Sequence, residues 1–273
     1  MIIDCHVHLS TFSYEGLSFS QICDNLVSSM QEHGINHSFI YPDCEPDTGV
    51  SDLDITVELV RRHPKLFMLG TASIPVIDSE IIDKLDTLAS TGDIIGVKLY
   101  PGFELFYPDE DRCHAIYQLC TKHDIPVVFH SGETMNEPWR EEYNHPFEIA
   151  KVATQFPSLK LIVAHFSQPH IADCRDVILK NPNVYADISG LAHPDVTRIC
   201  GKDAILSVLE DVATQQPEKI LFGTDWPICS VGEHLKLVNS LTVSEKVKTL
   251  ILSGNAESVF ALELDLEGSL KGR

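Results

Sequence analysis

Two histidines near the start of the chain, His6 and His8, are the first residues whose type and spacing could do chemistry. They close the segment 2–8, which we expect to be a β-strand. Successive side chains of a strand point to opposite faces, so the two imidazoles share one face, about 7 Å apart at roughly 3.3 Å per residue. Neutral imidazoles that converge suit a metal such as Zn²⁺. The alternative is a histidine-rich segment with no ligand role, because short strings of this kind recur by chance.

Four further apolar runs end in one polar residue that could bind a metal or move a proton. These residues are Lys98 after 94–97, His130 after 125–129, His165 after 161–164 and Asp225 after 220–224. If the runs are parallel strands of a barrel, their carboxyl ends lie on one rim, where active sites of such barrels are found. A single buried histidine is more often satisfied by a backbone carbonyl. Several such placements in register favour a shared site instead.

The elements that must position these residues alternate between strands and helices. Near-continuous apolar runs are typical of parallel strands covered by helices. The expected strands are 2–8, 38–41, 66–74, 94–99, 125–129, 161–164, 184–188 and 220–222. The expected helices are 19–33, 52–62, 79–90, 109–123, 146–156, 171–180 and 203–214, with further helices near 233, over 244–252 and from 256.

Eight such units in about 250 residues predict an α/β fold, a (β/α)₈ TIM barrel with its active site at the C-terminal rim of the strands. We expect one domain over residues 1–273. A doubly wound open sheet is the alternative, but it should carry a glycine-rich phosphate turn after its first strand. This chain has His6 and His8 at that position.

Composition and charge disfavour several classes of partner. The formal net charge is −20, so we expect no nucleic-acid or anionic-membrane partner. No segment has the length and purity of a membrane span, and the start lacks the pattern of a signal peptide. The eight cysteines are scattered, which predicts reduced thiols in a cytoplasmic protein. We expect a small-molecule substrate, and a homodimer is compatible with the sequence.

Seven segments in order make the chain similar to the amidohydrolase superfamily. More narrowly, it resembles the amidohydrolase-2 group, which includes aminocarboxymuconate semialdehyde decarboxylase. The resemblance spans nearly the whole chain, and the ordered set is far more specific than the two histidines alone. The matching segments are 3–8, 96–101, 128–132, 163–165, 185–190, 223–227 and 254–256.

The resemblance implies that His6, His8, His130 and Asp225 hold one divalent metal, most simply Zn²⁺. It also implies that His165 handles a proton beside Asp225, which makes these two the expected catalytic residues. Imidazole titrates near neutral pH and suits that role. In binuclear members of the superfamily a lysine at the position of Lys98 is carboxylated and bridges two metals. For this group we favour one metal and a free or structural lysine.

Other residues near the strand ends admit two interpretations each. Asp187 could orient a ligand imidazole or hold backbone amides. Arg140 could bind a substrate carboxylate, but pairing with a neighbouring glutamate is favoured. We expect Asp4 to be structural and Glu133 to be a solvated loop residue. Further candidates to face a substrate are Phe12, Tyr14, Tyr100, Phe103, Trp139, His193 and Trp226.

The predicted function is that of a metal-dependent hydrolase, in which activated water attacks a small amide, ester or lactone. A metal-dependent decarboxylase of an unsaturated or aromatic carboxylic acid is the first alternative. The short loops of the chain favour hydrolysis. A non-catalytic metal-binding barrel is the second alternative, but it would not need the proton-handling His165.

Overall fold

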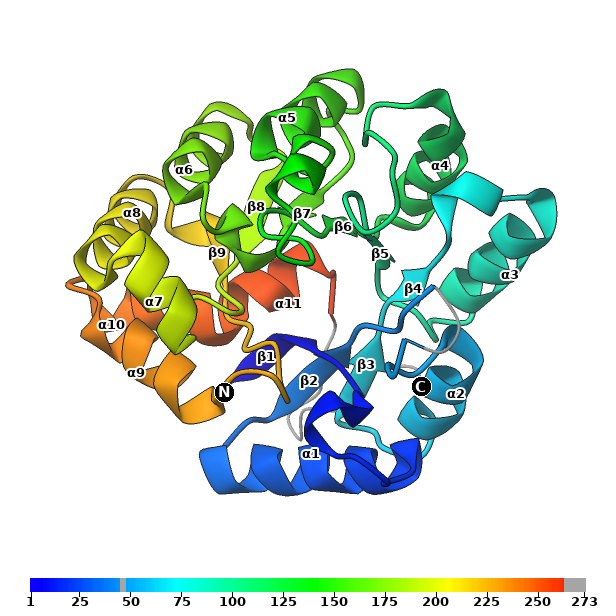
Figure 1. The fold of residues 1–273 in the computed structure, drawn as a ribbon, viewed down its shortest axis with the longest axis horizontal. Coiled ribbons are helices and arrows are strands. Elements are labelled where there is room, and N and C mark those ends of the chain that lie inside the picture. The colour runs from blue at the N-terminus through cyan, green and yellow to red at the C-terminus, as the bar shows by residue number, and fades with distance from the viewer. Residues whose placement is uncertain (45–47, 263–273) are drawn as a thin grey trace.

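Strands and helices alternate around a ring in the computed structural model, which describes residues 1–44 and 48–262 (Figure 1). Residues 45–47 and 263–273 of the single domain that the sequence predicts lie outside the described residues. The strands are β1 Ile3–Val7, β2 His37–Ile40, β3 Leu66–Met68, β4 Gly70–Thr71, β5 Val97–Leu99, β6 Val127–Phe129, β7 Leu161–Val163, β8 Val184–Asp187 and β9 Ile220–Leu221. The helices are α1 Phe19–His33, α2 Leu53–Val60, α3 Ser79–Ser90, α4 His114–His123, α5 Pro146–Gln155, α6 Ile171–Lys180, α7 Pro194–Cys200, α8 Lys202–Gln215, α9 Val231–Ser240, α10 Glu245–Thr249 and α11 Asn255–Val259.

All neighbouring strands are parallel and follow one another in chain order. The ladders form a three-stranded sheet, β1 to β3, and a six-stranded sheet, β4 to β9. β3 and β4 are parts of one predicted strand that is interrupted at Leu69; β3 pairs with β2 and β4 with β5. Between β9 and β1 there is no regular ladder, but backbone hydrogen bonds join Cys5 N to Phe222 O at 2.9 Å and Asp225 N to His6 O at 2.8 Å. The predicted (β/α)₈ barrel is therefore confirmed, although β9 and β1 are joined by single hydrogen bonds and not by a regular ladder.

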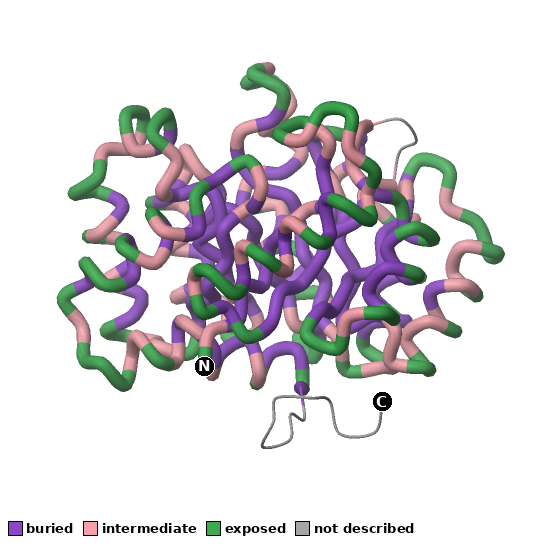
Figure 2. Tube along the Cα trace, turned by 90° about the horizontal axis from the view of Figure 1, so that it is seen from below, coloured by how far each residue is buried: buried purple, intermediate pink, exposed green. Residues whose placement is uncertain are grey.

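The strands of the barrel have one apolar core on their outer side and a second on their inner side. The outer core packs the strands against the ring of helices, while the inner core fills the barrel. Phe260, just after α11, contacts the inward-facing Phe39 with ring centroids 4.8 Å apart. It also lies against Gly96, just before β5 begins. α11 thus fills the interior from the end where strands start, which leaves the opposite rim for the site. Figure 2 shows the buried residues at the centre and exposed ones on the outer helices.

Helix ends follow the local chemistry of the sequence. Ser18 and Gln21 form a reciprocal capping box at the start of α1, and Gly34 ends it in the left-handed conformation that suits glycine. The sequence did not predict α7. The expected helices over 244–252 and from 256 are one helical run, joined by a π-helical turn at Leu250–Gly254.

Two whole-chain expectations can be compared with the structure. None of the eight cysteines forms a disulfide, in agreement with the prediction of reduced thiols. Among residues 1–44 and 48–262, no helix combines the length and the apolar character that crossing a membrane requires.

Candidate metal centre

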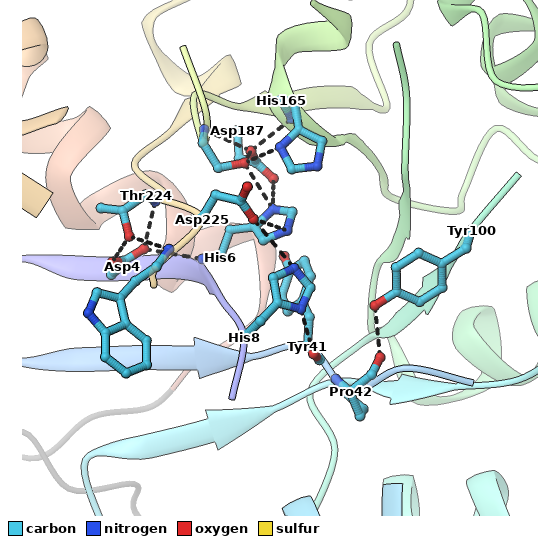
Figure 3. Close-up of polar contacts among 12 residues, drawn as sticks. Asp4, His6, His8, Tyr41, Pro42, Tyr100, His165, Asp187, Thr224 and Asp225 are labelled. Atoms are coloured by element: carbon cyan, nitrogen blue, oxygen red, sulfur yellow. Dashed lines mark hydrogen bonds and ion pairs between the residues drawn. The ribbon is translucent and has the colours of Figure 1, made fainter. Parts of the chain in front are cut away.

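Three of the predicted ligands meet where β1 and β9 end. His6 lies in β1, His8 directly follows it, and Asp225 lies four residues after β9 (Figure 3). One ligand atom from each of the three falls within 4.8 Å of the others. The Asp225 Oδ1 atom is 3.8 Å from His6 Nε2 and 3.5 Å from His8 Nε2. The strand ends therefore present two imidazoles and a carboxylate to one point.

The other nitrogen of each imidazole is already held in place. His6 Nδ1 lies 2.9 Å from Asp187 Oδ2, and His8 Nδ1 donates to the Tyr41 carbonyl at 2.9 Å. These contacts fix the tautomers in which both Nε2 atoms carry a lone pair. His6 Nε2 is buried and has no hydrogen-bond partner among the described residues. A divalent metal with nitrogen and carboxylate ligands fits this donor set.

His130, the fourth predicted ligand, lines the same cavity but lies outside this group of three. Its Nε2 donates to the Glu133 carbonyl at 3.0 Å, which leaves Nδ1 as the nitrogen able to bind a cation. Its ring centroid is 5.1 Å from that of His165. The structure thus brings three of the four predicted ligands together and places His130 beside them.

His165 belongs to a hydrogen-bonded chain that ends on Asp187. His165 Nδ1 is 2.8 Å from Ser189 Oγ, whose hydroxyl donates to the Asp187 carboxylate. The same carboxylate accepts the backbone N–H of His165 at 3.0 Å and of Ser189 at 3.0 Å. Asp187 therefore combines both roles considered from the sequence, because it orients His6 and also holds backbone amides.

The backbone carrying these side chains is strained and tightly packed. Three successive residues, His165 to Ser167, have positive φ, and Asp225 has φ +68°. Such conformations cost about 1–3 kcal/mol each and occur often at functional sites. A Cβ on Gly223 would lie 2.9 Å from His6 Cβ, and one on Gly132 would lie 2.0 Å from Gln168 O. Glycine at these two positions lets the loops after β9 and β6 approach the site.

Burial lowers the basicity of all four histidines around the site. It lowers the pKa of His8 to about 4 and that of His130 to about 3, and Lys98 acts in the same direction. The pKa values of His6 and His165 are lowered well below the usual range, mainly by burial. Neutral imidazoles are the form that binds metals and accepts protons. Burial also raises the pKa of Asp225 to about 7, partly offset by Lys98.

Lys98 is a fully buried amine on the wall of the same cavity. Its Nζ lies 5.1 Å from the centroid of the Tyr41 ring and 5.2 Å from that of Tyr100. The Nζ atom makes no hydrogen bond within the described part of the chain. Burial lowers its pKa to about 8, against the opposing effect of Asp187 and Asp225.

The loop residues separate into those that line the cavity and those that do not. The cavity, of about 630 Å³, is lined by the candidates Phe12, Tyr100, Phe103 and His193, and also by Glu133, which we expected to be a solvated loop residue. By contrast, Tyr14 packs on Trp226, with ring centroids 5.5 Å apart. Arg140 is ion-paired with Glu137 at 2.6 Å and lies over Trp139. Asp4 ties β1 to the end of β9, because it accepts the N–H of Thr224 at 2.9 Å and its hydroxyl at 2.6 Å.

Sequence reasoning gave no role to two residues of the site, Ser189 and Tyr41. Ser189 joins His165 to Asp187, and the Tyr41 ring lies on His6 with centroids 4.1 Å apart. Both could have been found by the rule that located the others. Tyr41 directly follows β2, and Ser189 lies two residues beyond Asp187 at the end of β8.

A second histidine group lies away from this cavity. His145, His170 and Asp173 also place ligand atoms within 4.8 Å of one another. His145 Nε2 is 3.4 Å from Asp173 Oδ2, and His170 Nε2 is 2.6 Å from Glu141 Oε2. These pairs connect the loop after β6 to the start of α6.

Solved structures share this fold over nearly their full length. An uncharacterized TIM-barrel protein from Bordetella bronchiseptica is 20% identical with a TM-score of 0.77, covering 95% of this chain and 98% of that one. An amidohydrolase from Burkholderia multivorans with bound zinc is 15% identical with a TM-score of 0.73, covering 96% and 100%. The 5-carboxyvanillate decarboxylase from Sphingomonas paucimobilis is 12% identical with a TM-score of 0.66, covering 96% and 99%.

These similarities describe the fold, whereas the sequence itself shows the family. A comparison with curated protein sequences found no significant match. The family model described as Amidohydrolase, however, matches residues 3–262, nearly the whole chain. The chain therefore belongs to the amidohydrolase family, in the amidohydrolase-2 group that its motifs resemble.

Proposed function

We propose that this chain is a metal-dependent hydrolase of a small amide, ester or lactone. One divalent cation, with Zn²⁺ the first candidate, is held by His6, His8 and Asp225, and His130 completes the set. The observation that carries the proposal is the buried, unpartnered Nε2 of His6, which faces Asp225 beside His8 Nε2. A solvated or purely structural histidine would not need this arrangement.

The bound cation supplies Lewis acidity and brings the pKa of water to about 7. The protein then has to hold the substrate and move protons. Because the Ser189 hydroxyl donates to Asp187, Ser189 Oγ accepts the proton on His165 Nδ1. This leaves His165 Nε2 as the basic nitrogen, and His165 lines the cavity. In this proposal His165 Nε2 takes the proton of the attacking water and returns it to the leaving group.

Decarboxylation of an unsaturated or aromatic carboxylic acid is the second candidate. The observation that favours it is Lys98, which places one cation beside the same histidines and could pair with a carboxylate.

A substrate screen separates the two candidates. The zinc-loaded protein is offered aryl and alkyl esters, lactones, amides and aromatic or enoic acids, and acid release and CO₂ release are both recorded. The proposal predicts acid release that stops on chelation and returns with metal. CO₂ release from the acids, with no hydrolysis of any other substrate, would instead support the lyase. The matched control is His165→Asn, which should keep its metal and lose turnover.

A further inference from the structure

We propose that the substrate is uncharged and carries an apolar aryl or alkyl group that lies at the cavity mouth, so that the site discriminates against di- and polycarboxylates. This inference rests on the proposed function and specifies which molecules that site accepts. It follows from the distribution of apolar and charged side chains along the cavity.

The cavity mouth is formed by exposed apolar side chains from several loops. Five of them are Phe12, Phe103, Met135, Ile199 and Ile228, with 72%, 42%, 55%, 59% and 51% of their surface exposed. They are nearly half of the 11 large apolar side chains that are exposed in the described part of the chain. Exposed apolar side chains gathered around one opening mark a binding surface for an apolar group.

The charges of the cavity are mostly negative. Besides the proposed ligand Asp225 and Asp195, which is paired with Arg198, its lining includes the carboxylates of Asp43, Glu104 and Glu133, against one lysine or arginine, Lys98, among the described residues. A cleft lined by one sign of charge lowers the local concentration of ligands with the same sign. A second or third carboxylate on a substrate would therefore approach acidic side chains.

The arginines on the surrounding loops are already occupied. Arg140 donates to Glu137 Oε2 at 2.6 Å and to the carbonyl of Gly102 at 2.9 Å. Arg198, in α7, donates to Asp195 Oδ1 at 3.0 Å. Bidentate arginine is the usual protein partner of a substrate carboxylate. Neither of these residues lines the cavity, so no described arginine is positioned for that contact.

Depth in the cavity fixes the orientation of the substrate. Lys98, His130 and His165 are buried, whereas Phe12 and Ile199 are exposed. The polar, reacting end of the substrate therefore lies among the histidines, and the apolar end extends outward between the loops.

Three hydroxamates that share a metal-binding head group test this inference. Acetohydroxamate has almost no tail, octanohydroxamate has an apolar tail, and suberic acid monohydroxamate has a tail of the same length that ends in a carboxylate. Their Kd values are measured by calorimetry on the zinc-loaded protein. Because each buried methylene contributes about 0.8 kcal/mol, we expect octanohydroxamate to bind at least about 10-fold more tightly than acetohydroxamate. The terminal carboxylate should remove most of that gain.

Variants at the mouth locate the effect. Ile199→Ser and Phe12→Ser should each weaken octanohydroxamate about 3- to 10-fold and leave acetohydroxamate unchanged. Val76→Ser is the matched control, because Val76 is 75% exposed but does not line this cavity.

The outcomes separate this inference from the proposed function. Equal affinities for the three compounds, or tighter binding of the suberic derivative, would overturn the inference and leave the metal centre standing. Failure of all three to bind, with no zinc retained by the protein, would overturn the metal centre and the inference with it.

Discussion

Histidines lie next to carboxylates in two regions of the structure. The distances between ligand atoms are similar in the two regions, but the hydrogen bonding and burial of the imidazole nitrogens differ. At the rim of the barrel, His6, His8 and Asp225 converge in a cavity; on the periphery, His145 and His170 lie near Asp173. The peripheral imidazoles are partly exposed, and the Nε2 atom of His170 is paired with Glu141 at 2.6 Å. At the rim, outside contacts hold both Nδ1 atoms, and His6 Nε2 is buried without a partner.

Proximity of ligand-type residues therefore does not by itself indicate a metal site. Partly exposed pairs of the peripheral kind contribute about 0–1 kcal/mol to stability, which is a sufficient reason for them to exist. A buried nitrogen that faces a carboxylate and bonds to nothing has an energetic cost, which a bound cation would offset. Variants in the two regions test this distinction.

The largest effect should come from His6→Ala. Removing a ligand from the centre should abolish stoichiometric metal binding and reduce hydrolysis to background. His170→Ala is the matched control from the peripheral group and should retain full metal and activity. Elemental analysis of the two purified variants makes the comparison. If His170→Ala lost the metal and His6→Ala kept it, the assignment of the two regions would be reversed.

His165→Asn should lower kcat by about 10²–10⁴-fold while metal content stays at the wild-type level, because the variant loses a proton carrier and not a ligand. Steady-state kinetics on a confirmed substrate, together with metal analysis, measures both quantities. Loss of metal in this variant would make His165 a ligand and favour a binuclear centre. Near-normal turnover would rule out the proton role.

Asp187→Asn should weaken metal affinity by about 10–100-fold, the usual cost of losing a carboxylate that orients a ligand imidazole. Competition with a zinc chelator gives the affinity, and the melting temperature shows whether the fold is retained. Unchanged affinity in a folded variant would leave Asp187 with its backbone contacts alone.

His234 tests whether burial alone lowers the pKa of a histidine in this protein, because it is buried and is not a proposed metal ligand. It is fully buried, but both nitrogens are used: Nδ1 donates to Ser230 O at 2.9 Å, and Nε2 accepts from Ala192 N at 3.4 Å. Burial lowers its pKa to about 4. As the pH falls, His234 therefore takes up a proton in the unfolded chain before it does so in the folded chain. The free energy of unfolding decreases as the pH drops from about 6.5 toward 4.

His234→Gln should remove this contribution. Between pH 7 and pH 5 the free energy of unfolding of wild type should fall by about 2 kcal/mol more than that of the variant. Urea unfolding of both metal-free proteins measures the difference, because the other histidines then contribute equally. Parallel pH profiles would show that His234 titrates normally in the folded protein.

The sequence predicted the fold and which side chains share one rim of it, because both depend on simple periodicities. Alternation along β1 placed His6 and His8 on one face, and the common direction of the strands brought Asp225 to them across more than 200 residues. The same rule placed His130 and His165 on the cavity. These predictions needed no knowledge of loop conformation.

Loop structure and hydrogen-bond partners could not be predicted in this way. α7 is only seven residues long and starts at Pro194, so it has little helical periodicity to detect. The link from His165 through Ser189 to Asp187 depends on positive φ values from His165 to Ser167, which the residue types do not favour. Pairing of Arg140 with a glutamate was the favoured interpretation, but the residue types did not identify Glu137 as the partner.

The most direct test of the account is a zinc titration of the metal-free protein, with bound metal and hydrolysis of an apolar ester followed together. We expect bound zinc and the rate of hydrolysis to reach their maximum at one equivalent of zinc per chain. Added bicarbonate should have no effect, and the double variant His145→Ala/His170→Ala should give the same curve. A requirement for a second equivalent with activation by bicarbonate would show a binuclear centre bridged by a carboxylated Lys98. Full hydrolysis before any zinc is added would contradict the central claim.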